Sequence, residues 1–470
     1  MMMKKTLLSI SLVTLLLSGC TAIVKTPYEA PNIAIPENFQ QDEVKKNSIL
    51  LNAEQLDRWW TLFGDKKLNY LVEQVLEKNS NLAVAGINLK QARLQAGLQK
   101  NQQGIRTNAG VSTGHSIDLN SGDDSGNGLS LNAGVSYELD LFGKLAKQSE
   151  ASQWEAIATE QDLQATAQSL IAETVKLYWQ LAYLHEREHY AQLNLETSKK
   201  LLSIVQAQFK AGAVSRLELT QAQHAVESQY SNISQIKQQL IETRTALAIL
   251  LHQPLQELSL DEPTRLAQIQ LPEISAGLPA TLLARRPDLQ AAEYRLRKAL
   301  ATKDATKASY YPSISLTGSL GSRSTSLIEL IQNPTLALGA SLNLPFLQVN
   351  DMKKNLAISD LEYEKTIIQY RQTLYQAFAD VEKALANRTE TNNQVELNKK
   401  TLELSEKTQQ LTEVRYKHGA IALKNVLDAQ QNTRSAYLSW LQSKQNQYNA
   451  YVTLLQALGG SPIVLPSVQP

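Results

Sequence analysis

The sequence lacks the residues on which several classes of protein depend. Its single cysteine, Cys20, excludes a disulfide framework and a thiol cluster for a metal ion. Because 46 lysines and arginines are balanced by 45 aspartates and glutamates, the basic excess typical of nucleic-acid-binding proteins is absent. No apolar run reaches the roughly 20 residues that a transmembrane helix needs. A membrane-spanning part would therefore have to be built from strands.

Glycine and proline are absent from two long stretches, residues 144–211 and 351–418. Each stretch therefore predicts one continuous helix of about 67 residues, roughly 100 Å long. Apolar residues recur in both at seven-residue steps, which indicates packing against neighbouring helices. These residues are Leu163, Leu170, Leu177, Leu184, Leu195, Leu202 and Phe209 in the first stretch and Ile367, Leu374, Val381, Leu397, Leu404 and Leu411 in the second. A lone two-stranded coiled coil would show the same steps.

Four shorter segments alternate apolar and polar residues, which is the pattern of strands with one apolar face. A pair precedes each long stretch, and the four segments cover residues 107–117, 131–141, 313–320 and 336–344. In the second segment Leu131, Val135 and Tyr137 alternate with polar residues such as Asn132 and Ser136. Polar linkers, residues 118–128 and 322–335, are predicted to join the strands of each pair.

The two halves of the chain repeat each other at an offset of about 207 residues. Residues 208–213 align with residues 415–420, and both segments end in glycine and alanine, as Gly212-Ala213 and Gly419-Ala420. At each of these points the long helix is predicted to turn into a return helix of about 35 residues. The repeating unit is the size of a domain, which indicates an internal duplication and not a short solenoid module.

The strands have the length and the alternation of transmembrane β-barrel strands. A soluble antiparallel sheet packed on helices would show the same alternation. Four strands cannot close a barrel, and lipid does not tolerate an open edge. A membrane sheet therefore requires two, three or four copies of the chain, giving eight, twelve or sixteen strands.

The N-terminal residues have the features of a secretory signal peptide. Lys4 and Lys5 precede a short apolar stretch, which ends at Leu17-Ser18-Gly19-Cys20. This ending resembles the bacterial lipobox, in which the cysteine is lipidated and becomes the first mature residue. Thr21 follows in place of an aspartate, which by the bacterial sorting rule indicates the outer membrane. An ordinary secretory signal with an incidental cysteine is the alternative.

Taken together, the chain resembles a lipidated outer-membrane factor of the TolC/OprM (NodT-like) efflux-duct family. Besides the lipobox and the two glycine-alanine turns, four segments carry the resemblance. They are Trp59-Trp60 followed by Phe63-Gly64-Asp65, residues 138–144 (Glu138-Leu139-Asp140-Leu141-Phe142-Gly143-Lys144), residues 285–289 (Arg285-Arg286-Pro287-Asp288-Leu289) and residues 311–316 (Tyr311-Pro312-Ser313-Ile314-Ser315-Leu316). The resemblance covers nearly the whole chain.

The resemblance implies a mainly α chain with a β-barrel portion, in which a trimer forms a 12-stranded outer-membrane β-barrel continued by a 12-helix periplasmic α-barrel. It implies a passive exit duct of a tripartite efflux system, with a periplasmic adaptor and an inner-membrane pump as partners. We expect no cofactor, no metal and no nucleic-acid partner. The predicted parts are a lipoprotein signal peptide (1–19), a lipid-anchored arm (20–65), a first repeat (66–254), an equatorial connector (255–285), a second repeat (286–460) and a C-terminal tail (461–470).

The resemblance also implies where the duct docks and where it closes. Gly212, Ala213, Gly419 and Ala420 are the expected adaptor-docking tips. Tyr416, Asn425 and Asp428 match positions of the periplasmic gate, where Tyr416 helps to latch the closed state and Asp428 lines the constriction. Asn425 replaces an acid that other members carry, and Ile421 stands where some have a latch arginine, so we expect a weaker acidic ring.

There are two alternatives to small-molecule efflux, one implied by the resemblance and one by a motif. A duct of the same family can serve type I protein secretion. Residues 185–189, His185-Glu186-Arg187-Glu188-His189, match HExxH, the motif of zinc hydrolases. No third ligand stands at a suitable spacing and no cleft-forming element is predicted nearby, so we expect two solvated histidines on a helix and no catalytic residue.

Overall fold

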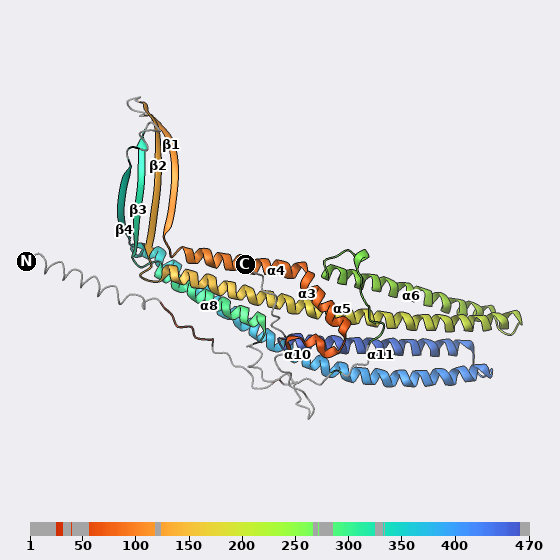
Figure 1. The fold of residues 1–470 in the computed structure, drawn as a ribbon. Helices are drawn as coiled ribbons and strands as arrows, with labels where there is room; N and C mark the ends of the chain where they lie inside the picture. The colour runs from red at the N-terminus through yellow and green to blue at the C-terminus, as the bar shows by residue number, and fades with distance from the viewer. Residues whose placement is uncertain are drawn as a thin grey trace, which may run out of the picture.

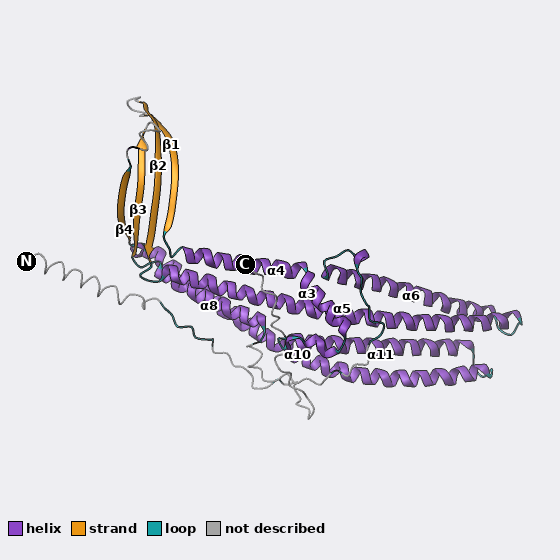
Figure 2. Cartoon of the chain, viewed as in Figure 1, coloured by secondary structure: helices purple, strands orange, loops and turns teal. Residues whose placement is uncertain are grey.

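The computed structural model describes residues 25–31, 39, 56–117, 124–266, 271, 285–324, 332 and 334–460. In this part the chain is mainly helical, and a four-stranded sheet stands at one end, at an angle to the long helices (Figures 1 and 2). The helices are α3 (Lys66–Lys78), α4 (Ser80–Asn101), α5 (Lys144–Lys210), α6 (Arg216–Leu250), α8 (Pro287–Ala308), α10 (Val349–Lys417) and α11 (Leu423–Ala457), and the strands are β1 (Arg106–Ile117), β2 (Asp124–Leu139), β3 (Ser313–Ser324) and β4 (Thr335–Asn343). The predicted combination of long helices with two strand pairs is confirmed.

The two long helices begin where a strand ends. Gly143 takes a left-handed conformation with a φ of 76° just before α5. The carboxylate of Asp140 accepts hydrogen bonds from the backbone N–H groups of Leu145 (3.0 Å) and Ala146 (2.7 Å). These groups have no partner within the helix, so the carboxylate satisfies them and opposes the positive end of the helix dipole. The turn therefore fixes the angle between β2 and α5.

The sheet joins the two repeats through its middle. Its strand order is β1-β2-β3-β4, and every neighbouring pair is antiparallel. The β2–β3 pairing runs from Leu129 opposite Ser324 to Leu139 opposite Ile314. The strands are longer than predicted, because β2 starts at Asp124 and β3 continues to Ser324, inside the segments predicted as polar linkers.

The helices form a row that matches the row of strands. Near the sheet the order is α4, α5, α8, α10, and these helices lead into or out of β1, β2, β3 and β4 respectively (Figure 1). Further away α5 and α6 form one antiparallel hairpin, called here the first hairpin, and α10 and α11 form the second hairpin. The two hairpins meet where α11 packs on α5.

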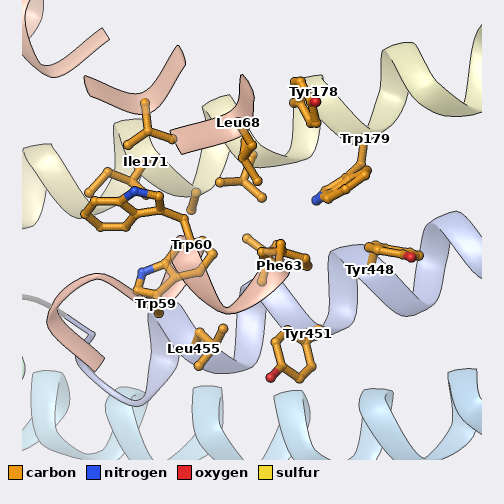
Figure 3. Packing of buried hydrophobic residues seen from close by; sticks show 14 of the residues in the cluster. Trp59, Trp60, Phe63, Leu68, Ile171, Tyr178, Trp179, Tyr448, Tyr451 and Leu455 are labelled. Carbon is orange, nitrogen blue, oxygen red and sulfur yellow. The ribbon is translucent and has the colours of Figure 1, made fainter. Parts of the chain in front are cut away.

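The core lies where the two hairpins separate from the row of helices. There the short 3-10 helix η1 (Trp59–Phe63) inserts three aromatic side chains between α5 and α11 (Figure 3). The ring of Phe63 lies 5.4 Å from that of Trp179, which lies 4.9 Å from that of Tyr448. Burial of such large apolar groups is the main source of stability in a core. The N-terminal arm is thereby fixed to both repeats.

Candidate functional site

One face of the sheet is apolar and uncovered. The apolar residues of the four strands lie in cross-strand rows, for example Val135, Gly318 and Leu338. Leu336 and Leu338 on β4 are 72% and 82% exposed. In the described part of the chain no helix is packed over the sheet (Figure 1). The alternative of a soluble sheet packed on helices therefore does not fit, since such a sheet would hide these side chains.

The opposite face is polar and made of small side chains. Besides glycines and Ala337, its residues in the middle of the sheet are Asn108, Ser112, Ser130, Asn132, Ser136, Ser315, Thr317, Ser319, Thr335 and Ser341. The hydroxyls of Ser112 and Ser130 lie 2.7 Å apart and form a hydrogen bond. Gly134 leaves room for Asn108, because a Cβ at position 134 would lie 2.5 Å from the side-chain oxygen of Asn108. This face suits contact with water.

The chain also presents apolar stripes at the edges of its row of helices. Large exposed apolar side chains lie on α4 at one edge and on α10 at the other. They are Val84, Ile87, Leu94 and Leu98 on α4, and Leu361, Ile368, Tyr375, Leu397, Leu404 and Leu411 on α10. The predicted heptad positions of α5, by contrast, are mostly buried within the chain. Among the helices of the described residues, none combines the length and the apolar composition needed to cross a bilayer.

The ends of the two hairpins are tight turns with exposed residues. Gly212 and Gly419 have φ angles of 73° and 71°, a conformation that costs glycine little and other residues more. The N–H of Ala213 donates to the carbonyl oxygen of Gln208 (2.8 Å), and Ala420 repeats this bond in the second hairpin. All four predicted tip residues are exposed.

The two tips differ in how the return helix starts. Ser215 caps α6, and the carboxylate of Glu218 accepts from the N–H of Ser215 (2.7 Å), which completes a capping box. Hydrogen bonds from the hydroxyl and from the backbone N–H of Ser215 lower the pKa of Glu218. Ala422 precedes α11 and provides no side-chain cap. The second tip is therefore less firmly held. The aligned sequences of the tips show this difference, because Ser215 in the first tip aligns with Ala422 in the second.

The predicted gate residues lie on both sides of the second tip, Tyr416 in the last turn of α10 and Asn425 and Asp428 in the first turns of α11. The half-buried Tyr416 packs against a small cluster formed by Val205, Ala222 and Leu423, and its hydroxyl donates to the side-chain oxygen of Gln208 (3.2 Å). This contact joins the tips of the two hairpins. Sequence reasoning missed Gln208 as the partner of the latch tyrosine, because nothing in either segment marks the pair.

Asp428 is exposed on the first turns of α11 but is not a free carboxylate. The ammonium group of Lys424, one helical turn earlier, donates to it at 2.6 Å. Asn425 is exposed beside them. The cation was readable from the sequence, since residues four apart share a helix face. An axial ring of Asp428 would therefore carry partly compensated charge.

The prediction of two solvated histidines in the HExxH motif is wrong for His185. Its Nε2 atom lies 2.6 Å from the carboxylate of Glu262, in the segment that follows α6. Arg244 donates to the same carboxylate with two hydrogen bonds of 2.6 and 2.8 Å. His189 is exposed. Within the described ranges no group of three histidine, cysteine, aspartate or glutamate side chains is placed to hold a metal ion.

The electrostatics of Glu262 fit a firm ion pair. Burial opposes ionisation of its carboxylate, but the hydrogen bonds from Arg244 and His185 outweigh burial and lower the pKa of Glu262 to about 2. The carboxylate is therefore charged at any neutral or mildly acidic pH. The histidine serves to hold a loop, which explains its place in the middle of a helix.

Cys20 lies outside the described residues, but residues 25–31 of the arm that follows it are described. The N–H and hydroxyl of Thr26 donate to the carboxylate of Asp304 at 3.0 and 2.7 Å, and Asp304 is 1% exposed. The guanidinium of Arg297 lies 4.2 Å from the ring of Tyr28. Six residues separate Cys20 from Thr26, a reach of at most about 20 Å. Since Asp304 lies near the end of α8 that leads to β3, an anchor at Cys20 would lie close to the sheet.

Comparisons with known proteins place these features in one family. Residues 71–251 and 278–460 match the family described as outer membrane efflux protein. The pyoverdine export outer membrane protein OpmQ of Pseudomonas putida is 30% identical, over 91% of this chain and 92% of its own. The cation efflux system protein CusC of Escherichia coli K12 is 27% identical, over 95% of this chain and 98% of its own.

Solved structures agree with the sequence comparisons. The outer-membrane channel OprN superposes with a TM-score of 0.83 at 27% identity, covering 93% of this chain and 99% of that one. The open state of the MtrE outer membrane channel of Neisseria gonorrhoeae gives 0.82 at 30% identity, covering 94% and 98%. These chains share the order of strands and long helices over almost their whole length. The chain therefore belongs to the outer membrane efflux protein family.

Proposed function

We propose that three copies of this chain form the exit duct of a tripartite efflux system. In this duct a twelve-stranded barrel in the outer membrane continues into a periplasmic tunnel of twelve helices. The observation that carries the proposal is the four-stranded sheet with one uncovered apolar face, one polar face and two open edges. Such a sheet is stable in lipid only when copies of it close into a ring.

The edges of the chain suit this closure. The strand order leaves β1 and β4 unpaired on their outer sides, and the matching helix row leaves α4 and α10 at its edges. In a ring, β1 of one copy meets β4 of the next, and the apolar stripe of α4 meets the part of the α10 stripe near the sheet, since α4 has 22 residues and α10 has 69. Buried apolar area stabilises such contacts by about 25 cal/mol per Å². A β3 strand of 12 residues is about 40 Å long, enough to span the hydrocarbon core with the tilt usual in barrels.

The exposed hairpin tips are the proposed docking site for a periplasmic adaptor, which links the duct to an inner-membrane pump. A glycine with positive φ and a neighbouring alanine leave the backbone of each tip accessible. A partner hairpin can therefore approach closely at Gly212-Ala213 and Gly419-Ala420. The gate formed by Tyr416, Asn425 and Asp428 lies directly beside the second tip. Adaptor binding at the tips would act on this gate.

The lipid anchor at Cys20 is a second attachment to the outer membrane, in addition to the strands. Twelve lipid-facing strands are sufficient for membrane residence, so the anchor assists and does not create it. A Cys20→Ser variant with a conventional cleavage site should leave trimers in the outer-membrane fraction. Recovery of the entire variant as soluble periplasmic protein would show that the strands do not enter the membrane.

Small solutes are the proposed cargo. Two of the relatives named above are a pyoverdine export protein and a cation efflux protein, and other relatives belong to antibiotic and toluene efflux pumps. Since the chain is 27–30% identical to all of them, identity does not single out one cargo. The middle of the polar face carries neutral residues, while Arg106, Glu138 and Arg323 stand nearer the strand ends, so both signs of charge are present and neither cations nor anions are singled out as cargo.

Deletion of the gene tests the proposal. Cells without the chain should accumulate at least one of a dye, a hydrophobic antibiotic, a siderophore and a metal ion more than wild-type cells. The wild-type chain should restore efflux. Unchanged accumulation of all four, in cells that produce the adaptor and the pump, would overturn the proposed function.

A further inference from the structure

The first two residues of the HExxH motif hold the segment that follows α6 against the two hairpins. His185 contacts Glu262 of this segment, and Arg244 from α6 pairs with the same carboxylate. The next residue, Glu186, accepts a hydrogen bond from the backbone N–H of Leu266 (3.0 Å). Leu266 is buried in the main core. The segment up to Leu266 is thus fixed to the first hairpin at two points.

Glu186 has a second partner, which belongs to the second hairpin. The hydroxyl of Tyr437 on α11 donates to the other carboxylate oxygen of Glu186 (3.3 Å). The ring of Tyr437 stacks on that of Tyr190, with centroids 3.7 Å apart. Burial and the nearby Glu186 raise the pKa of Tyr437, so its hydroxyl keeps the proton that makes this bond. One side chain of α5 therefore ties the connector and α11 together.

Between this level and the tips, few polar contacts among the described residues join the two hairpins. On the side of this level that is nearer the sheet, the hydroxyl of Tyr183 donates to Gln442 (2.7 Å), and a hydrogen bond joins Gln180 to Gln445. Below it, in the part of the chain that the structure describes, the hydrogen bonds and ion pairs between the hairpins reduce to that of Tyr416 with Gln208 at the tip. The firm polar contacts thus end at Glu186 and Tyr437.

We propose that Glu186 is a positioning residue that sets the level at which the second hairpin pivots away from the first when the duct opens. This inference rests on the proposed function, in which the tips open. The backbone N–H of Leu266 in the connector binds one carboxylate oxygen of Glu186, and the hydroxyl of Tyr437 binds the other. The lack of a side-chain cap at the start of α11 makes the second hairpin the one that yields.

The geometry gives the pivot a useful lever. Tyr437 lies 14 residues after Leu423, the first residue of α11, which at 1.5 Å per residue is about 21 Å of helix. A rotation of about 14° at the pivot therefore moves this end of α11 by about 5 Å. A displacement of this size at each of three tips would widen a constriction enough to pass a solute.

Distance measurements between spin labels test the pivot in the detergent-solubilised trimer. One label pair, at Lys210→Cys and Lys417→Cys, reports the tips, because these exposed residues end the two long helices. A reference pair, at Glu173→Cys and Lys383→Cys, lies above the pivot. Both pairs are placed in a Cys20→Ser background and labelled sparsely, so that single pairs dominate the signal.

Two variants loosen the pivot in different ways. Glu186→Gln removes the charge and one acceptor, and Tyr437→Phe removes the hydroxyl but keeps the ring that stacks on Tyr190. Each should lengthen or broaden the tip distance by about 5 Å and leave the reference distance unchanged. The control is Glu196→Gln, an exposed glutamate lower on the same helix, which should change neither distance.

Tip distances that stay unchanged in both variants would overturn the proposal. So would an equal change in the reference pair, because it would show general loosening of the fold. The measurement is independent of transport. A tip that responds as expected in a chain that supports no efflux in cells would support the pivot and count against the proposed function.

Discussion

Placing an arginine on the apolar face of the sheet should destabilise the assembled protein. Leu338, in the middle of β4, is 82% exposed on the apolar face. Its neighbour Ala337 points to the opposite, polar face of the same strand, since side chains alternate. Leu338→Arg and Ala337→Arg thus put the same charge at almost the same depth on opposite faces.

The expected difference is large. An arginine on the lipid face of a barrel costs about 2–4 kcal/mol near the bilayer midplane, and less near the interfaces. Since 1.4 kcal/mol is tenfold in an equilibrium constant, Leu338→Arg should shift the folding equilibrium about 30-fold to 700-fold. In the proposed barrel, Ala337→Arg places its charge in the water-filled interior and should change stability by less than about 1 kcal/mol.

Denaturant unfolding of the protein in lipid vesicles measures this difference. The midpoint should fall clearly for Leu338→Arg and stay near wild type for Ala337→Arg, with slopes unchanged. Equal effects of the two variants would refute the assignment of the apolar face to lipid. A larger effect of Ala337→Arg would reverse the two faces.

Three further predictions concern the helical part. The pKa of Glu262 in the folded chain, about 2, lies below the ordinary 4.5. The ion pair of Glu262 therefore stabilises the fold fully above about pH 5, and this stabilisation is lost as the pH falls towards 2. Arg244→Gln should cost up to about 3 kcal/mol at pH 7 and should flatten the acid dependence of the thermal midpoint. An unchanged acid dependence would contradict the ion pair. Ala420→Trp should abolish efflux while trimers still assemble on native gels, and normal efflux would move the docking site. Lys424→Gln should strengthen cation preference in single-channel recordings and Asp428→Ala should weaken it; unaltered selectivity in both would place this pair away from the axis.

The long helices and their turns could be predicted from the sequence because few forces compete there. A stretch without glycine or proline, with an apolar residue at every seventh position, has one regular structure available. A glycine after it must supply the positive φ of the turn. The strands followed from alternation, but the start of β2 at Asp124 did not, because apolar alternation fades in the polar residues before Leu129 while the backbone pairing continues.

The tertiary contacts of the site could not be predicted in the same way. Glu262 lies 77 residues from His185, and nothing local marks either as a partner. The heptad positions of α10 read like those of α5, yet Leu397, Leu404 and Leu411 remain exposed in the single chain, whereas Leu374 and Val381 are buried in the core. A seven-residue step shows that a helix packs, but not whether the partner belongs to the same chain or to another copy.

The number of chains in the assembly tests the trimeric duct most directly. Native mass spectrometry of the protein, extracted from outer membranes in mild detergent, counts the copies in one measurement. A mass of three chains is predicted, which brings twelve strands together from the four in each chain. A mass of one, two or four chains would contradict the twelve-stranded barrel and the tunnel of twelve helices beneath it.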